Sequence, residues 1–196
     1  AVSLADTIRV FNLARAANVP CFSSSSLRYS PGIFGMRDNP AIGKVLGCDA
    51  YGRNAPLEPS HPDLFYYGIH STEMLFTIMG TGCVSVSRTK TETTDYVVGA
   101  WNDGRIGTFR GIREGAGPFG ATVFGTKGVA PAGKFEGYAP LLVEIVKFFK
   151  TGEPPVAEAE TLEIYAFMEA ADESKRQGGL PVTLESVLEK ARAEAK

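Results

Sequence analysis

Three consecutive segments in the middle of the chain have the alternating pattern of β-strands, and they constrain the fold more than any other feature. They are residues 83–90, 91–101 and 105–113, of which the second is rich in Thr, Val and Tyr. Asn102-Asp103-Gly104 forms a strong hairpin turn between the last two. Further strands are predicted at residues 44–51 and 121–124. A purely helical bundle is therefore excluded.

Helices are predicted on both sides of these strands. The spacing of apolar residues predicts them over residues 63–79, 138–150, 157–177 and 184–196. Gly80, Gly152 and Gly178-Gly179 follow three of these segments, at the positions where helices commonly end. Strands grouped together with helices around them predict an α+β fold, with a large open sheet, mostly antiparallel or mixed, covered by helices on one face.

The first residues have the pattern of an alternating α/β layer. Ser3 and Asp6 have the spacing of a helix start, and the amphipathic helix that follows ends near Asn18. Val19-Pro20 then leads into a predicted strand at residues 21–23. We interpret residues 1–31 as the tail of such a layer, whose beginning lies outside this sequence.

Charge and cysteine content exclude several classes of protein. The chain has 20 Lys and Arg against 22 Asp and Glu, a net charge of −2, which does not favour nucleic-acid binding. The longest apolar run, residues 140–149, contains Glu144 and Lys147 and is too short to cross a bilayer, and no signal peptide is visible. Three widely separated cysteines form no disulfide framework, so we predict a cytoplasmic protein without membrane or nucleic-acid partners.

A glycine pattern that is typical of dinucleotide loops occurs at Gly115, Gly117 and Gly120. In such a loop a helix follows and presents its free N–H groups to the pyrophosphate. Here Pro118 lies inside the pattern and a strand is predicted after it, so we interpret the segment as a glycine-rich hairpin loop. The sequence therefore contains no nucleotide-binding fingerprint.

His70 is the main candidate for acid–base chemistry. Tyr66, Tyr67 and Glu73 surround it in the same predicted helix, and Glu73 shares its helical face. A metal site would need a third ligand at a recognisable spacing, which neither His61 nor any other residue supplies, so no metal is predicted. From the residues alone, a general acid/base and a structural histidine are equally supported.

Arg28 follows a run of four serines, residues 23–26, which lacks the G-x-S-x-G context of a catalytic nucleophile. Together with Tyr29, Arg28 is able to bind a phosphate or carboxylate through two hydrogen bonds. The alternative is an arginine that is solvated or paired within the protein.

Several of these stretches together resemble the glucose-fructose oxidoreductase and inositol dehydrogenase family, often written Gfo/Idh/MocA. The resemblance rests on the order and spacing of the segments, and the segment around His70 is the most specific. The segments are residues 3–6 (SLAD), 19–29 (VPCFSSSSLRY), 66–75 (YYGIHSTEML), 124–128 (FGTKG) and 160–174.

The resemblance implies two parts. Residues 1–31 would be the terminal helix and strand of a truncated dinucleotide-binding (Rossmann) domain, and residues 32–196 a C-terminal α+β domain for substrate binding and oligomerisation. The family's cofactor is NAD or NADP. Its glycine loop and catalytic Lys-Pro pair would lie before Ala1, so we expect that this chain alone neither binds the cofactor tightly nor turns over.

The family pairs an Asp with a His four residues later. His70 matches this histidine, while Tyr66 stands in place of the aspartate, so the resemblance implies these two as catalytic residues acting on a sugar or polyol-like alcohol. The residues expected around the substrate are Arg28, Tyr29, Tyr67 and Glu73. Two alternatives stay open: a non-catalytic module that forms homo-oligomers through its sheet face, and an NAD-dependent glycosidase of the same family.

Overall fold

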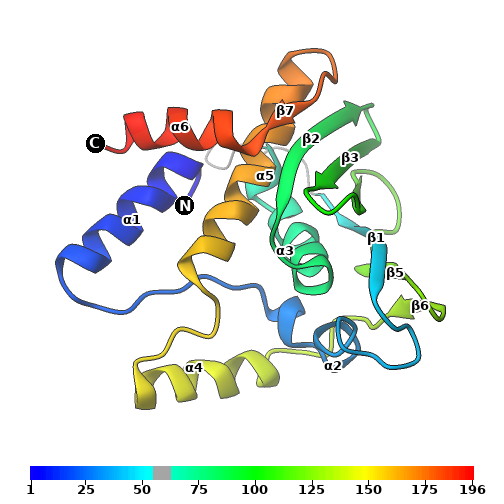
Figure 1. Cartoon of the computed structure of the whole chain (residues 1–196), viewed down its shortest axis with the longest axis horizontal. Coiled ribbons are helices and arrows are strands. Elements are labelled where there is room, and N and C mark those ends of the chain that lie inside the picture. The colour runs from blue at the N-terminus through cyan, green and yellow to red at the C-terminus, as the bar shows by residue number, and fades with distance from the viewer. Residues whose placement is uncertain (55–62) are drawn as a thin grey trace.

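A seven-stranded mixed sheet forms the centre of the computed structural model, which describes residues 1–54 and 63–196 (Figure 1). The strand order is β6-β5-β1-β4-β3-β2-β7, and the pairing of β1 with β4 is parallel while the others are antiparallel. The strands are β1 (Val45–Arg53), β2 (Cys83–Lys90), β3 (Thr94–Trp101), β4 (Ile106–Ile112), β5 (Gly120–Gly125), β6 (Val129–Ala132) and β7 (Val182–Thr183). The predicted α+β fold with a mixed sheet is confirmed.

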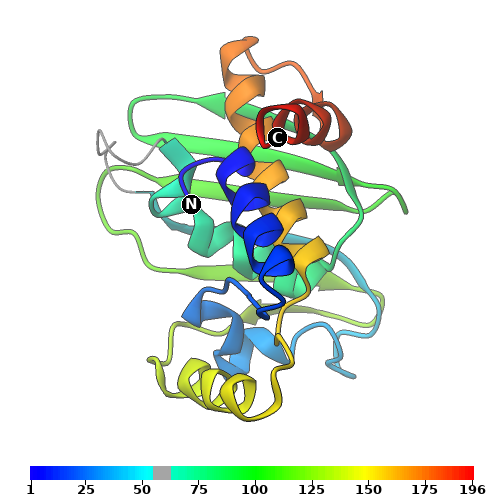
Figure 2. The same ribbon diagram turned by 90° about the vertical axis from the view of Figure 1, so that its left-hand side faces the viewer.

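The helices cover one face of this sheet. α3 (Gly68–Met79) packs on β1 and β4, and α5 (Glu158–Arg176) packs on β2. α1 (Leu4–Ala16) forms a further layer against α5 and α6 (Leu184–Glu194), and Figure 2 shows these three helices in front of the strands. The remaining helical elements are α2 (Pro31–Phe34), α4 (Ala139–Thr151) and the short 3₁₀ helices η1 (Ser26–Tyr29) and η2 (Asp63–Phe65).

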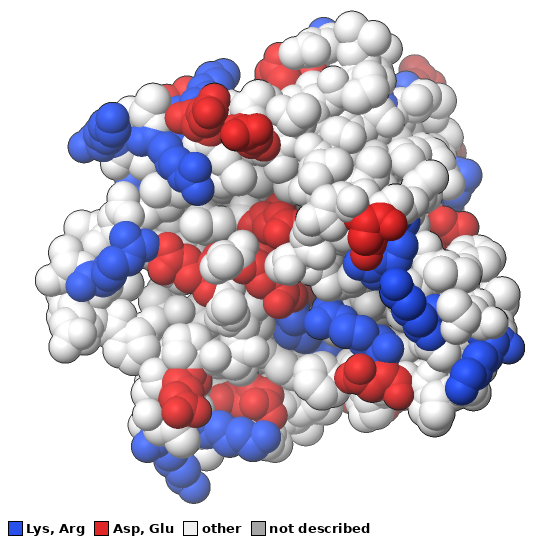
Figure 3. Space-filling model, viewed as in Figure 1, with Lys and Arg blue, Asp and Glu red and all other residues white. Residues whose placement is uncertain are grey.

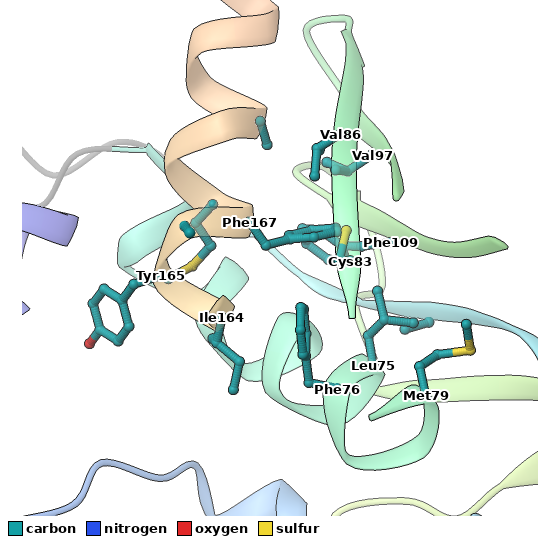
Figure 4. Close-up of a cluster of buried hydrophobic side chains, with 14 of the residues drawn as sticks. Leu75, Phe76, Met79, Cys83, Val86, Val97, Phe109, Ile164, Tyr165 and Phe167 are labelled. Carbon is teal, nitrogen blue, oxygen red and sulfur yellow. The ribbon is translucent and has the colours of Figure 1, made fainter. Parts of the chain in front are cut away.

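The hydrophobic core lies where α3 and α5 meet the sheet (Figure 4). Phe76 of α3 packs against Phe167 of α5 and Trp101 of β3, with ring centroids 5.7 Å and 5.6 Å apart. Phe76, Phe109 and Phe167 are fully buried. Each such side chain contributes about 1.5–3 kcal/mol when it leaves water, so this layer fixes α3, which carries the candidate site, against the sheet.

The ends of the helices follow the sequence signals. The Ser3 side chain accepts a hydrogen bond from the Asp6 amide at 3.0 Å and caps α1. Gly80 ends α3 with a φ of 77°, a left-handed value that glycine adopts without strain. The predicted helix over residues 63–79 is divided into η2 and α3.

The strand predicted at residues 21–23 does not form. The prediction was wrong because a strand needs a neighbour for its backbone hydrogen bonds, and no strand of the described residues runs beside this segment. Instead, Phe22 packs edge-on against Phe148 of α4, with ring centroids 4.9 Å apart. The division at residue 31 remains a prediction.

The loop with Gly115, Gly117 and Gly120 is not a hairpin loop as predicted. It joins β4 to β5, and β1 lies between these two strands. A Cβ on Gly117 would lie 2.8 Å from Arg53 Cδ, and one on Gly120 would lie 2.4 Å from the Tyr51 hydroxyl oxygen. These glycines therefore let the connection cross close to β1.

Outside residues 55–62, which include His61, no helix is long and apolar enough to cross a membrane. The face of the molecule in Figure 3 carries acidic and basic side chains in small mixed groups, without a continuous basic surface.

Candidate functional site

His70 lies in the first turn of α3, where the chain leaves η2 and enters the helix. Its Nδ1 atom is 2.9 Å from the Ser25 hydroxyl oxygen. Two aromatic rings meet the imidazole edge-on: Tyr67, with its centroid at 5.7 Å, and Phe119, at 5.8 Å. The ring is thus held by three groups from separate parts of the chain.

The buried environment favours the neutral form of His70. Burial lowers the pKa of the imidazole below its usual value of 6.5, because a charged ring loses hydration. In the part of the chain that the structure describes, Nε2 of His70 has no hydrogen-bond partner. The His70 side chain is partly exposed.

Arg28 and Glu73 form a buried ion pair in the same part of the structure as His70. The Arg28 Nε atom donates to Glu73 at 2.5 Å, and its Nη2 atom donates to Glu160 of α5, also at 2.5 Å. Ser24 donates a further hydrogen bond to Glu73 at 3.2 Å. Burial raises the pKa of Glu73, and the neighbouring Arg28 offsets part of this effect.

This pairing changes the interpretation of two predicted substrate-binding residues. Arg28 is only 6% exposed and Glu73 only 3%, and they neutralise each other. The sequence alternative of an arginine that is paired within the protein is the one the structure contains. Direct contact of these two side chains with a substrate stays a prediction.

The three tyrosines occupy different environments. Tyr66 and Tyr67 meet edge-to-face, with ring centroids 4.9 Å apart, and Tyr67 is 37% exposed beside His70. Tyr29 is buried and stacks against Phe34, and burial raises the pKa of its hydroxyl. Tyr66 and Tyr67 thus lie with His70 at the start of α3, whereas Tyr29 lies at the buried end of η1.

A buried network of charges anchors the chain just before these tyrosines. The Arg88 guanidinium, which is fully buried, contacts Asp63 of η2 at 2.9 Å and Asp95 at 2.5 Å, and it also contacts Asp172 of α5. Arg113 and Lys175 add further ion pairs to Asp63. These cations hold the pKa of Asp63 well below its usual range, whereas burial and the nearby Asp63 charge raise the pKa of Asp172 to about 7.

Sequence reasoning missed two residues of the site, Ser25 and Phe119. Ser25 belongs to the serine run of residues 23–26, which we did not assign to the site, and Phe119 belongs to the glycine-rich loop. Gly52 of β1 makes room for Phe119, because a Cβ there would lie 2.3 Å from its ring. The glycines of the loop were the available signal, since they mark a close approach of chain segments.

The glycine-rich loop does not have the form of a dinucleotide loop. It leads into β5, so no helix N-terminus follows it that could face a pyrophosphate. Within residues 1–54 and 63–196, no group of three or more His, Cys, Asp and Glu side chains is arranged to hold a metal ion.

No protein-family model matches the sequence, and no curated protein matches it either. Solved structures of dehydrogenases do match the fold. A probable dehydrogenase from Thermotoga maritima is 22% identical with a TM-score of 0.77, and the match covers 95% of this chain and 71% of that one.

Two inositol dehydrogenases give similar results. Myo-inositol 2-dehydrogenase from Lactobacillus plantarum has a TM-score of 0.75 at 15% identity, with 93% of this chain and 70% of that one covered. Myo-inositol dehydrogenase from Lactobacillus casei, solved with NAD(H) and myo-inositol, has a TM-score of 0.71 at 14% identity, with 93% and 68% covered. The fold implied by the resemblance is thus confirmed.

Proposed function

We propose that this chain is the substrate-facing part of an NAD(P)-dependent oxidoreductase that acts on a sugar or polyol-like alcohol. The observation that carries the proposal is the placement of His70, which is partly exposed beside Tyr67 while its Nδ1 is held by Ser25. The fold supports it, because this fold also occurs in dehydrogenases, one of them solved with NAD(H) and myo-inositol.

In this proposal His70 and Tyr66 are the acid–base groups next to the reacting oxygen, and Tyr67 contacts the substrate. Arg28 and Glu73 act indirectly, since their ion pair joins η1 to α3 and so holds the Ser25 segment against His70. Tyr29, at the end of η1, stacks against Phe34 of α2.

The cofactor would be held by a dinucleotide-binding domain that is not part of these 196 residues. The form of the glycine loop supports this, because the loop leads into a strand and lacks the helix that would face a pyrophosphate. Such a domain supplies hydride chemistry, while the residues of this chain bind and orient the substrate.

Titration with myo-inositol and a panel of sugars and polyols, followed by NMR, tests the proposal. We expect the ring signals of His70 to shift and saturate at millimolar concentration for at least one compound. The indole signal of Trp101, which is buried and bonded to the Gly80 carbonyl oxygen, is an internal control that should stay in place. If no compound moves the His70 signals, or if Trp101 moves equally, the proposal fails.

A parallel titration with NADH, followed by fluorescence, tests the location of the cofactor site. We expect no saturable binding in the micromolar range. Saturation there would show that these residues hold the dinucleotide themselves.

A second candidate function, a homo-oligomerisation module, is favoured by the uncovered face of the sheet. Ile106 is 55% exposed and Phe124 is 38% exposed, and both lie beside Gly47 in the register of β4, β1 and β5. Arg110 stacks over the Tyr96 ring on the same face, 4.9 Å from its centroid. If assembly were the only function, replacing His70 by Ala in the complete enzyme would leave activity intact.

A further inference from the structure

The hydroxyl of Ser25 makes two hydrogen bonds in a buried position. Its oxygen accepts the amide hydrogen of Leu27 at 3.2 Å, and it lies 2.9 Å from Nδ1 of His70. Ser25 is only 6% exposed. Water therefore contributes little to the hydrogen bonding of this hydroxyl, and its proton must find an acceptor within the protein.

Counting donors and acceptors distinguishes the two neutral forms of His70. A hydroxyl has one proton to donate and two lone pairs to accept with. If Nδ1 carried the ring proton, the Ser25 oxygen would accept from both Leu27 and His70, and its own proton would lack an acceptor among the described residues. If Nδ1 is unprotonated, the Ser25 hydroxyl donates its proton to Nδ1 and accepts from Leu27, so the hydroxyl and Nδ1 both have partners.

We propose that Ser25 is a positioning residue that holds neutral His70 with its proton on Nε2, so that His70 presents a hydrogen-bond donor to a substrate carbonyl oxygen. This inference rests on the proposed function. Tyr67 and Phe119 meet the His70 ring edge-on. Among the described residues, the contact with Ser25 is therefore the hydrogen bond that selects the tautomer.

The consequence concerns the kind of substrate that the resting site accepts. An N–H group at Nε2 donates to a carbonyl oxygen and polarises it, whereas it is unable to accept the proton of an alcohol. The resting site therefore suits the ketone or aldehyde form of the substrate best, and it binds the alcohol form by donating to its hydroxyl oxygen.

NMR of the ring nitrogens tests the tautomer directly. The His61→Gln chain leaves His70 as the one histidine, and its spectrum is recorded above the pKa of the ring. We expect Nδ1 to resonate as an unprotonated nitrogen and Nε2 as a protonated one. The reverse pattern, or two averaged signals, would overturn the proposal.

Substitutions identify Ser25 as the cause. In Ser25→Ala, the ratio of the two tautomers should change about threefold to tenfold, as expected for the loss of one hydrogen bond of ordinary strength. Ser24→Ala, which removes the neighbouring bond to Glu73, should leave the ratio unchanged, and Ser25→Thr should retain it. An unchanged ratio in Ser25→Ala would contradict the role of Ser25.

The measurement on the unsubstituted Ser25 decides the proposal even if Ser25→Ala fails to fold. It is made without ligand, so it is also independent of the proposed function. Absence of polyol binding with the expected tautomer would remove the function and leave the hydrogen-bond assignment, whereas binding with the opposite tautomer would do the reverse.

Discussion

Arg28 donates from Nε to a carboxylate oxygen of Glu73 at 2.5 Å, and both side chains are almost completely buried. The pair connects η1 with the middle of α3, and Glu160 extends the connection to α5. Three segments that are distant in the sequence thus meet at one guanidinium group.

Replacing Arg28 by Ala should destabilise the protein by about 3–5 kcal/mol, because the Glu73 carboxylate would stay buried without its partner. Urea denaturation of the variant and the native chain measures this difference. Arg9→Ala is the matched control, since the Arg9–Asp6 pair is exposed and should contribute less than about 1 kcal/mol. Similar losses of stability in the two variants would show that the buried Arg28 pair contributes no more to stability than an exposed pair.

Asp172→Asn should change how stability depends on pH. Burial and the Asp63 charge raise the pKa of Asp172 to about 7 in the folded protein, so the folded state holds a proton that the unfolded state releases near its ordinary value of 3.8. The contribution of this group to stability is therefore present at low pH and is lost as the pH rises toward the folded pKa.

We compare the free energy of unfolding of Asp172→Asn with that of the native chain. The variant should gain stability relative to the native chain between pH 5 and pH 8, by roughly 1 kcal/mol or more. Thermal and urea unfolding at the two pH values measures the difference. A constant difference would indicate that Asp172 is ionised throughout, as its contact with Arg88 alone would suggest.

Replacing Phe119 by Ala should raise the pKa of His70 toward 6.5. Burial lowers this pKa, and Phe119 is one of the rings that cover the imidazole. An NMR titration of the His70 ring protons measures the midpoint. Phe149→Ala removes a ring that is 81% exposed on α4 and serves as the control. An equal midpoint in Phe119→Ala and the native chain would contradict the prediction.

Lysine substitution at both Ile106 and Phe124 should dissociate any homo-oligomer formed through the open sheet face. The added charges would have to be buried without partners in such an interface. Light scattering should show a multiple of the 21.0 kDa chain mass before substitution and the single-chain mass afterwards. Val143→Lys on α4, where Val143 is 53% exposed, should leave the mass unchanged. A native chain that is already monomeric would contradict oligomerisation.

Local sequence patterns were sufficient for most elements and insufficient for their arrangement. The alternation of β2 to β4 and the periodicity of α4 to α6 are signals within single elements, and the structure confirms them. β6 and β7, with four and two residues, are too short for such a signal. The insertion of β1 between β4 and β5 depends on long-range pairing, which no local pattern contains.

The same distinction applies to the candidate site. Tyr66, Tyr67 and Glu73 lie within four positions of His70 in the sequence, so their proximity follows from the local course of the chain. Ser25 lies 45 positions from His70 in the sequence and Phe119 lies still farther away. Their contacts with His70 arise from packing, and a single sequence does not encode them in a readable form.

The placement of β1 also has a consequence for how the protein is made. Both neighbours of β1 in the sheet are synthesised after it, so the strand leaves the ribosome before either can pair with it. Contacts of this kind form slowly, because a long loop must close before they contribute any stability. Phe119 reaches Gly52 only after β5 has been added, and we therefore expect the contacts around the His70 ring to be among the last parts of the nascent protein to form.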